Sequence, residues 1–111
     1  MISTFLDQLR ESVLLGDGAI GTEMISRGAD ISKGIESCNI VCPDMVLQLH
    51  EDYVSAGSRV IETNTFAANR ISLAKRGMDS QIREIITSGV SLAKRAAGSK
   101  AYVAGSVGPL P

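Results

Sequence analysis

What this chain of 111 residues lacks excludes several large classes of protein. No stretch approaches the roughly 20 consecutive apolar residues of a membrane span, and the N-terminus lacks the apolar core of a secretory signal. Basic residues are scattered and the net charge is −1, so the chain offers no basic patch for nucleic acid or an anionic membrane. We therefore expect a cytoplasmic protein whose partners include neither nucleic acid nor a membrane.

The chain is also poor in residues that bind metals or act as nucleophiles. With one histidine, His50, it supports no specific Ser-His-Asp or Cys-His arrangement. Its two cysteines, Cys38 and Cys42, are too few for a disulfide framework and lack the second pair that a zinc site held by this chain alone needs. We expect two buried or partly buried thiols, and a histidine that packs against other side chains or lies at the surface.

What the chain does contain is an ordinary globular composition, 44% hydrophobic and 21% charged, with three short apolar runs. Helical stretches separate the runs, which is typical of parallel strands in an α/β protein. Each run ends in a cluster of Gly, Asp, Thr, Asn or Ser, and α/β proteins bind ligands at that end of a parallel sheet. We expect strands at residues 13–16, 59–63 and 101–104, and polar clusters at residues 16–22, 62–66 and 105–109.

The helices between these strands follow from apolar spacing and from Gly and Pro at their ends. Residues 29–42 fit neither the helical nor the strand period, so a loop is expected there. A sheet of only three strands has two open edges, which indicates the start of a larger domain. The expected helices are residues 1–12, 19–27, 43–56, 69–76 and a last one that Asp79 or Ser80 caps and that ends at Gly98.

Residues 16–21 read Gly-Asp-Gly-Ala-Ile-Gly and match the G-x-G-x-x-G pattern of dinucleotide-binding loops. Two details oppose that interpretation. Asp17 puts a carboxylate where the pyrophosphate would bind, and no strand leads into an acidic residue about 20 positions later. The alternative is a small-molecule site in which Asp17 accepts a hydrogen bond from an ammonium group. A third possibility is a tight turn in which Asp17 caps the following helix.

The two later polar clusters are also open to more than one interpretation. Thr63, Asn64 and Thr65 can donate hydrogen bonds to a ligand carboxylate, or can form a turn that closes the strand. We expect Phe66 to belong to the core. Residues 105–109, Gly-Ser-Val-Gly-Pro, can present backbone amides to a ligand or form a rigid loop.

Four segments carry a resemblance to a known family when they are taken together and in order: residues 14–22, residues 43–50 with Tyr53 and residues 56–57, residues 61–70, and residues 103–109. They resemble the homocysteine S-methyltransferase family, and the resemblance covers nearly the whole chain. It implies a (β/α)8 barrel, of which residues 1–111 are an incomplete homocysteine-binding domain truncated after the third strand. The Glu-Thr-Asn-Thr-Phe-x-x-Asn-Arg run is closest to bacterial members, including modules of methionine synthase and fusions to methylenetetrahydrofolate reductase.

In this family a methyl group moves to the sulfur of homocysteine, which zinc holds as a thiolate. The resemblance implies that Asp17 helps hold the substrate amino group, that Gly18 makes the neighbouring backbone contact, and that Thr63 lies near the substrate carboxylate. Asn64 and Thr65 belong to the same motif and are further candidates for substrate binding.

The zinc ligands of the family are three cysteines on later strands, beyond residue 111, and Cys38 and Cys42 do not match them. We therefore expect the full-length protein to make methionine from homocysteine and a methyl donor with zinc as cofactor, and the 111-residue chain alone to be inactive. Downstream folate, cobalamin or reductase modules are compatible with this function. Two alternatives remain. One is a nucleotide-binding module of a doubly wound sheet, built on the loop from Gly16 to Gly21, and the other is a non-catalytic barrel remnant whose open sheet edges associate.

Overall fold

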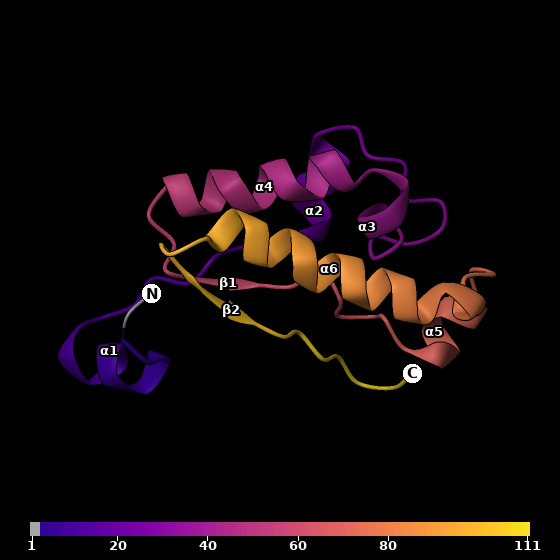
Figure 1. Ribbon diagram of the computed structural model, residues 1–111. Coiled ribbons are helices and arrows are strands. Elements are labelled where there is room, and N and C mark those ends of the chain that lie inside the picture. The colour runs from indigo at the N-terminus through magenta and orange to yellow at the C-terminus, as the bar shows by residue number, and fades with distance from the viewer. Residues whose placement is uncertain (1–2) are drawn as a thin grey trace.

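A small parallel sheet covered by two long helices forms the centre of the computed structural model, which describes residues 3–111 (Figure 1). Helices α4 and α6 lie side by side over the two strands, β1 and β2. None of the helices in the described part of the chain combines the length and the apolar character that a membrane crossing requires. The elements are α1 (Phe5–Glu11), α2 (Gly21–Ser26), α3 (Cys38–Val41), α4 (Pro43–Ser55), β1 (Val60–Glu62), α5 (Arg70–Ala74), the 3-10 turn η1 (Asp79–Gln81), α6 (Ile82–Ala97) and β2 (Tyr102–Ala104).

The sheet confirms two of the three expected strands and corrects the first. Strands β1 and β2 are parallel, with Ile61 opposite Val103. Residues 13–16 form no strand: Gly16 makes a single parallel bridge to Val60. This segment lies at the sheet edge, and Val13 is 96% exposed, so little burial stabilises further pairing. All three segments nevertheless run in the same direction, as the sequence predicted.

Two expectations about helices were wrong. Residues 29–42 are not all loop, because α3 forms within them, and its first two residues, Cys38 and Asn39, are buried. The last long helix is capped by neither Asp79 nor Ser80. Those residues form η1 instead, and α6 follows at Ile82 without a side-chain cap.

The other expected helices are present with shifted ends. The helix expected over residues 1–12 is α1, and residues 1–2 of that range lie outside the described residues. Pro43 begins α4, as predicted, and the side chain of Asn69 caps α5 by accepting a hydrogen bond from the Ser72 amide at 2.8 Å.

The core lies where α4 and α6 meet each other and the sheet. Ile61 of β1 is fully buried in one cluster with Ala93 and Ala97 of α6, whose small side chains let the helix lie close to the strand. Leu49 of α4 and Leu92 of α6 belong to a second buried cluster. Because both helices pack firmly on the sheet, the ends of its strands are held at fixed positions.

His50 of α4 is completely buried, and within residues 3–111 neither of its ring nitrogens has a hydrogen-bond partner. This burial lowers the pKa of His50 below its ordinary value of 6.5. The unfolded chain therefore binds a proton at a higher pH than the folded chain does. The contribution of the neutral His50 imidazole to the free energy of unfolding is therefore fully present above pH 6.5, and it is lost as the pH falls through the lowered pKa.

We expect the free energy of unfolding, measured with urea, to be smaller at pH 5 than at pH 7. His50→Leu should reduce this difference, because His50 is the single histidine of the chain. An unchanged difference between the two pH values in the variant would show that other groups cause it.

Candidate functional site

The polar clusters after all three parallel segments meet around one cavity of about 310 Å³. We call it the strand-end cavity. Four of the five residues that the sequence nominated for substrate binding line it, together with Ser106 of the third cluster. Those four residues are Gly18, Thr63, Asn64 and Thr65. The structure thus brings together residues that are up to 88 positions apart in the sequence, from Gly18 to Ser106.

Hydrogen bonds between two threonines and Ser106 join the end of β1 to the end of β2. The Thr63 and Thr65 hydroxyls lie 2.7 Å apart, and Thr65 donates to the Ser106 carbonyl at 2.8 Å. Since that uses the single proton of Thr65, Thr63 donates to Thr65. Thr63 also accepts from the Ser106 amide at 3.0 Å. Both hydroxyl protons are therefore committed within the protein, and the threonines fix the two loops relative to each other.

Asn64, which follows β1, and Asn39 of α3 form a buried amide pair. Asn64 Nδ2 donates to Asn39 Oδ1 at 2.9 Å and to the Ile35 carbonyl at 3.0 Å. Asn39 Nδ2 donates to the Asn64 carbonyl at 2.8 Å and to the Ile85 carbonyl at 3.0 Å. Both amide hydrogens of Asn64 are thus used by the protein. The sequence did not point to Asn39, which lies in the segment expected to be a loop.

Asp17 lies beside the strand-end cavity, directly before Gly18, and does not line it. Its Oδ2 atom accepts a hydrogen bond from the Glu62 amide at 3.0 Å, which ties the first polar cluster to the end of β1. Burial raises the pKa of Asp17 above its ordinary value of 3.8, and the hydrogen bond from Glu62 opposes that rise. Glu36 and Glu62 are the charged residues lining the cavity in the described chain. The site therefore favours a positively charged group such as an ammonium.

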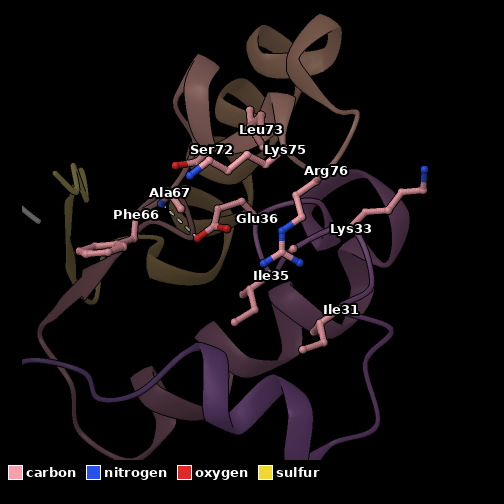
Figure 2. Close-up of a pocket in the computed structure, with 11 residues that line it drawn as sticks. Ile31, Lys33, Ile35, Glu36, Phe66, Ala67, Ser72, Leu73, Lys75 and Arg76 are labelled. Atoms are coloured by element: carbon pink, nitrogen blue, oxygen red, sulfur yellow. Dashed lines mark hydrogen bonds between the residues drawn. The ribbon is translucent and has the colours of Figure 1, made fainter. Parts of the chain in front are cut away.

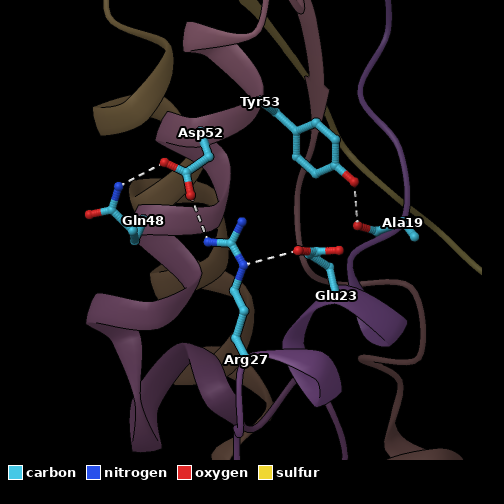
Figure 3. Close-up of polar contacts among 6 residues, drawn as sticks. All are labelled: Ala19, Glu23, Arg27, Gln48, Asp52 and Tyr53. Atoms are coloured by element: carbon cyan, nitrogen blue, oxygen red, sulfur yellow. Dashed lines mark hydrogen bonds and ion pairs between the residues drawn. The ribbon is translucent and has the colours of Figure 1, made fainter.

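Tyr53, which the sequence offered only as part of one of the four segments of the family resemblance, positions the loop that precedes α2. Its hydroxyl reaches from α4 and donates to the Ala19 carbonyl at 2.7 Å (Figure 3). Nearby, Arg27, the residue that follows α2, contacts Glu23 at 3.2 Å and Asp52 of α4 at 2.7 Å. The ion pairs are partly exposed and contribute little by themselves, but together these contacts hold the loop that carries Asp17 against α4.

The third polar cluster packs closely on the second. Gly108 donates its amide to the Phe66 carbonyl at 2.9 Å, and a Cβ at position 108 would lie 2.5 Å from that oxygen, so only glycine fits there. Phe66 itself is 59% exposed, which corrects the expectation that it belongs to the core. Phe66 lines the strand-end cavity instead.

The described residues do not fit a metal ion. Cys38 is buried, as expected, and burial raises the pKa of its thiol to about 12, so it stays protonated. Cys42 is partly buried. Within residues 3–111 no group of three His, Cys, Asp or Glu side chains is arranged to hold a metal ion.

One family model and several known proteins match most of the chain. The family model described as homocysteine S-methyltransferase matches residues 14–111. The methionine synthase of Mycobacterium tuberculosis is 37% identical over 118 aligned residues, which cover 94% of this chain and 10% of that protein. The homocysteine S-methyltransferase of Escherichia coli is 32% identical over 114 aligned residues, which cover 90% of this chain and 36% of that protein.

Solved structures agree with these sequence matches. The oxidized form of the homocysteine methyltransferase MmuM from Escherichia coli superposes with a TM-score of 0.77 at 32% identity, covering 91% of this chain and 39% of that chain. Its metallated form gives a TM-score of 0.77 at 30% identity. The chain therefore spans between a tenth and two fifths of the relatives described here.

Proposed function

Because this chain belongs to the homocysteine S-methyltransferase family, we propose that it serves the transfer of a methyl group to the sulfur of homocysteine, which yields methionine. The observation that carries the proposal is the strand-end cavity, where Asp17 and Gly18, residues 63–65 and Ser106 meet. A carboxylate beside a cavity without basic lining residues suits the amino group of an amino-acid substrate.

We propose that the chain forms the N-terminal part of a (β/α)8 barrel. Support comes from the parallel order of residues 15–17, β1 and β2, from the helices between them, and from the superposition on 39% of a homocysteine methyltransferase. In a barrel of this kind the carboxyl ends of all strands lie at the catalytic face. The strand-end cavity lies at that face.

In the proposed site each residue has a distinct role. Asp17 accepts a hydrogen bond from the substrate ammonium, and Gly18 offers its backbone to the ligand. Thr63, Asn64 and Thr65 surround the substrate carboxylate. Since their hydroxyl and amide protons are committed within the protein, they act mainly by shaping the cavity and holding its backbone amides in place.

The metal of the family is, in our proposal, zinc. Since no three metal-binding side chains come together in residues 3–111, we propose that the zinc ligands lie outside this chain. We accordingly propose that the 111-residue chain binds homocysteine and does not by itself complete methyl transfer. Folate, cobalamin or reductase modules are candidate partners.

Calorimetric titration of L-homocysteine into the chain under reducing conditions tests the proposed binding site. We expect saturable binding of homocysteine, and no saturable binding of NAD or FAD in a parallel fluorescence titration. Saturable NAD or FAD binding without homocysteine binding would favour the nucleotide-binding module instead. A separate assay of methionine formation tests the proposed inactivity, which zinc-dependent turnover abolished by a chelator would contradict.

A further inference from the structure

A second cavity, of about 400 Å³, adjoins the strand-end cavity (Figure 2). It lies between the loop that precedes α3 and the end of α5. The two cavities share Ile35, Glu36 and Phe66 as lining residues, so they lie next to each other. We call the second one the basic cavity, because its lining includes Lys33, Lys75 and Arg76.

The three cations of the basic cavity have no carboxylate partner within 4.0 Å in residues 3–111. Arg27, by contrast, contacts two carboxylates. The one acidic lining residue is Glu36, and its Oε2 atom accepts from the Ala67 amide at 3.2 Å. The Lys33 ammonium points away from the other charged groups in Figure 2, so Lys75 and Arg76 are the cations beside Glu36 in this cavity. The charged residues that line the strand-end cavity in the described part of the chain are both acidic, Glu36 and Glu62.

The remaining residues that line the basic cavity are mostly apolar. Ile31, Ile35 and Leu73 supply an apolar wall, and Figure 2 shows Arg76 reaching from the end of α5 toward Ile35. Concave sites with an apolar wall and a few converging charged groups are typical of small-molecule binding. A guanidinium matches the two oxygens of a carboxylate or phosphate, and an ammonium adds a point charge.

We propose that the basic cavity binds an anionic group of the second substrate, the methyl donor, as a carboxylate or a phosphate. This inference rests on the proposed function. The reacting end of the donor then lies in the strand-end cavity, and its anionic end lies past Glu36 against Lys75 and Arg76. The two cavities together select a donor that has a negatively charged extension, and they disfavour a small donor whose only charge is positive.

Amide NMR spectra test the proposal on the whole chain, with inorganic pyrophosphate and the peptide Glu-Glu-Glu as probes. We expect saturable shifts of the amides of Lys33, Ile35 and residues 75–76. The double variant Lys75→Gln/Arg76→Gln should weaken binding by about tenfold or more, since it removes two charge-assisted contacts. The matched control Lys94→Gln/Arg95→Gln removes the same charge from the last turn of α6 and should leave binding within about twofold, because these charges lie outside the basic cavity.

The outcomes separate the sources of the anion. Binding of pyrophosphate alone assigns the cavity to phosphate, binding of the peptide alone assigns it to carboxylate, and binding of both assigns it to their shared chemistry. Equal weakening in both double variants, or no saturable shift with either probe, overturns the proposal.

A titration of L-homocysteine into the same variants distinguishes this inference from the proposed function. Lys75→Gln/Arg76→Gln should bind homocysteine as tightly as the unmodified chain does. Homocysteine binding without any anion binding would refute the basic cavity and leave the proposed function intact. Anion binding without homocysteine binding would refute the assignment of the anion to a methyl donor.

Discussion

Asn39→Ala is expected to lower the free energy of unfolding by about 3 kcal/mol, because each buried polar group left without a partner costs roughly 1–3 kcal/mol. The substitution leaves the Asn64 carbonyl without its side-chain donor and deprives Asn64 Nδ2 of one acceptor. Asn39 and Asn64 are 1% and 3% exposed, so water does not replace the lost contacts. The loss is a large part of the roughly 5–15 kcal/mol that stabilises a typical domain.

Urea denaturation measures this effect, with Gln48→Ala as the matched control. Gln48 is an exposed amide whose one hydrogen bond, to Asp52, is also exposed, so its removal should change stability by less than about 0.5 kcal/mol. Similar decreases in the free energy of unfolding in the two variants would show that the buried amide pair contributes no more to stability than an exposed amide does.

A second substitution tests whether the amide itself is responsible. A Cβ at Gly89 would lie 2.6 Å from Asn39 Nδ2, so Gly89→Ala forces the pair apart and should destabilise the chain although alanine favours helix. In the Asn39→Ala background only the 3.0 Å approach of this Cβ to Thr65 Cγ2 remains, so Gly89→Ala should cost less there. Strictly additive effects of the two substitutions on the free energy of unfolding would show that positions 39 and 89 are not in contact.

Asp17→Ala is expected to weaken homocysteine binding by about 10- to 100-fold, since a hydrogen bond to a charged group contributes roughly 1.5–3 kcal/mol. Because this variant also removes the acceptor of the Glu62 amide, Asp17→Asn is the sharper test. Its side-chain oxygen still accepts from Glu62, and only the charge is lost. We expect both variants to bind homocysteine weakly in a calorimetric titration.

Two controls assign that effect to the substrate amino group. The exposed Glu51→Ala on α4 carries the same charge change and should leave homocysteine binding unaltered. The analogue 4-mercaptobutyrate has no amino group and should bind the Asp17 variants and the unmodified chain equally. An unchanged affinity for homocysteine in Asp17→Asn would rule out the proposed role.

The same contact predicts a pH dependence. An ammonium is held by the ionised carboxylate, and burial raises the pKa of Asp17 above 3.8. Homocysteine affinity should therefore fall as the pH is lowered through this raised pKa, at a higher pH than an exposed aspartate would show. The dependence should be absent in Asp17→Asn.

By itself the sequence determined the direction of the three parallel segments and the clustering of Gly18, residues 63–65 and Ser106 at one end of the sheet. This was possible because apolar runs separated by helices allow few chain paths, and because the carboxyl ends of parallel strands lie together. Gly and Pro also placed helix ends well: Pro43 begins α4, and Gly98, with a φ of +50°, follows α6.

Only the tertiary structure decided which polar side chains line the strand-end cavity and which form hydrogen bonds with one another. Asn39 lies in a segment without helical or strand periodicity. The short helix α3 is held there by the Asn39 side-chain amide, which bonds to Asn64 and to the Ile85 carbonyl, both distant in the sequence. The exposure of Phe66 also depends on how separate elements pack, and so does the presence of Lys33, Lys75 and Arg76 around one cavity. A local sequence pattern indicates the propensity of a segment for helix or strand and the face that it buries. Hydrogen-bond partners and the charge of a cavity depend on residues that are far apart in the chain.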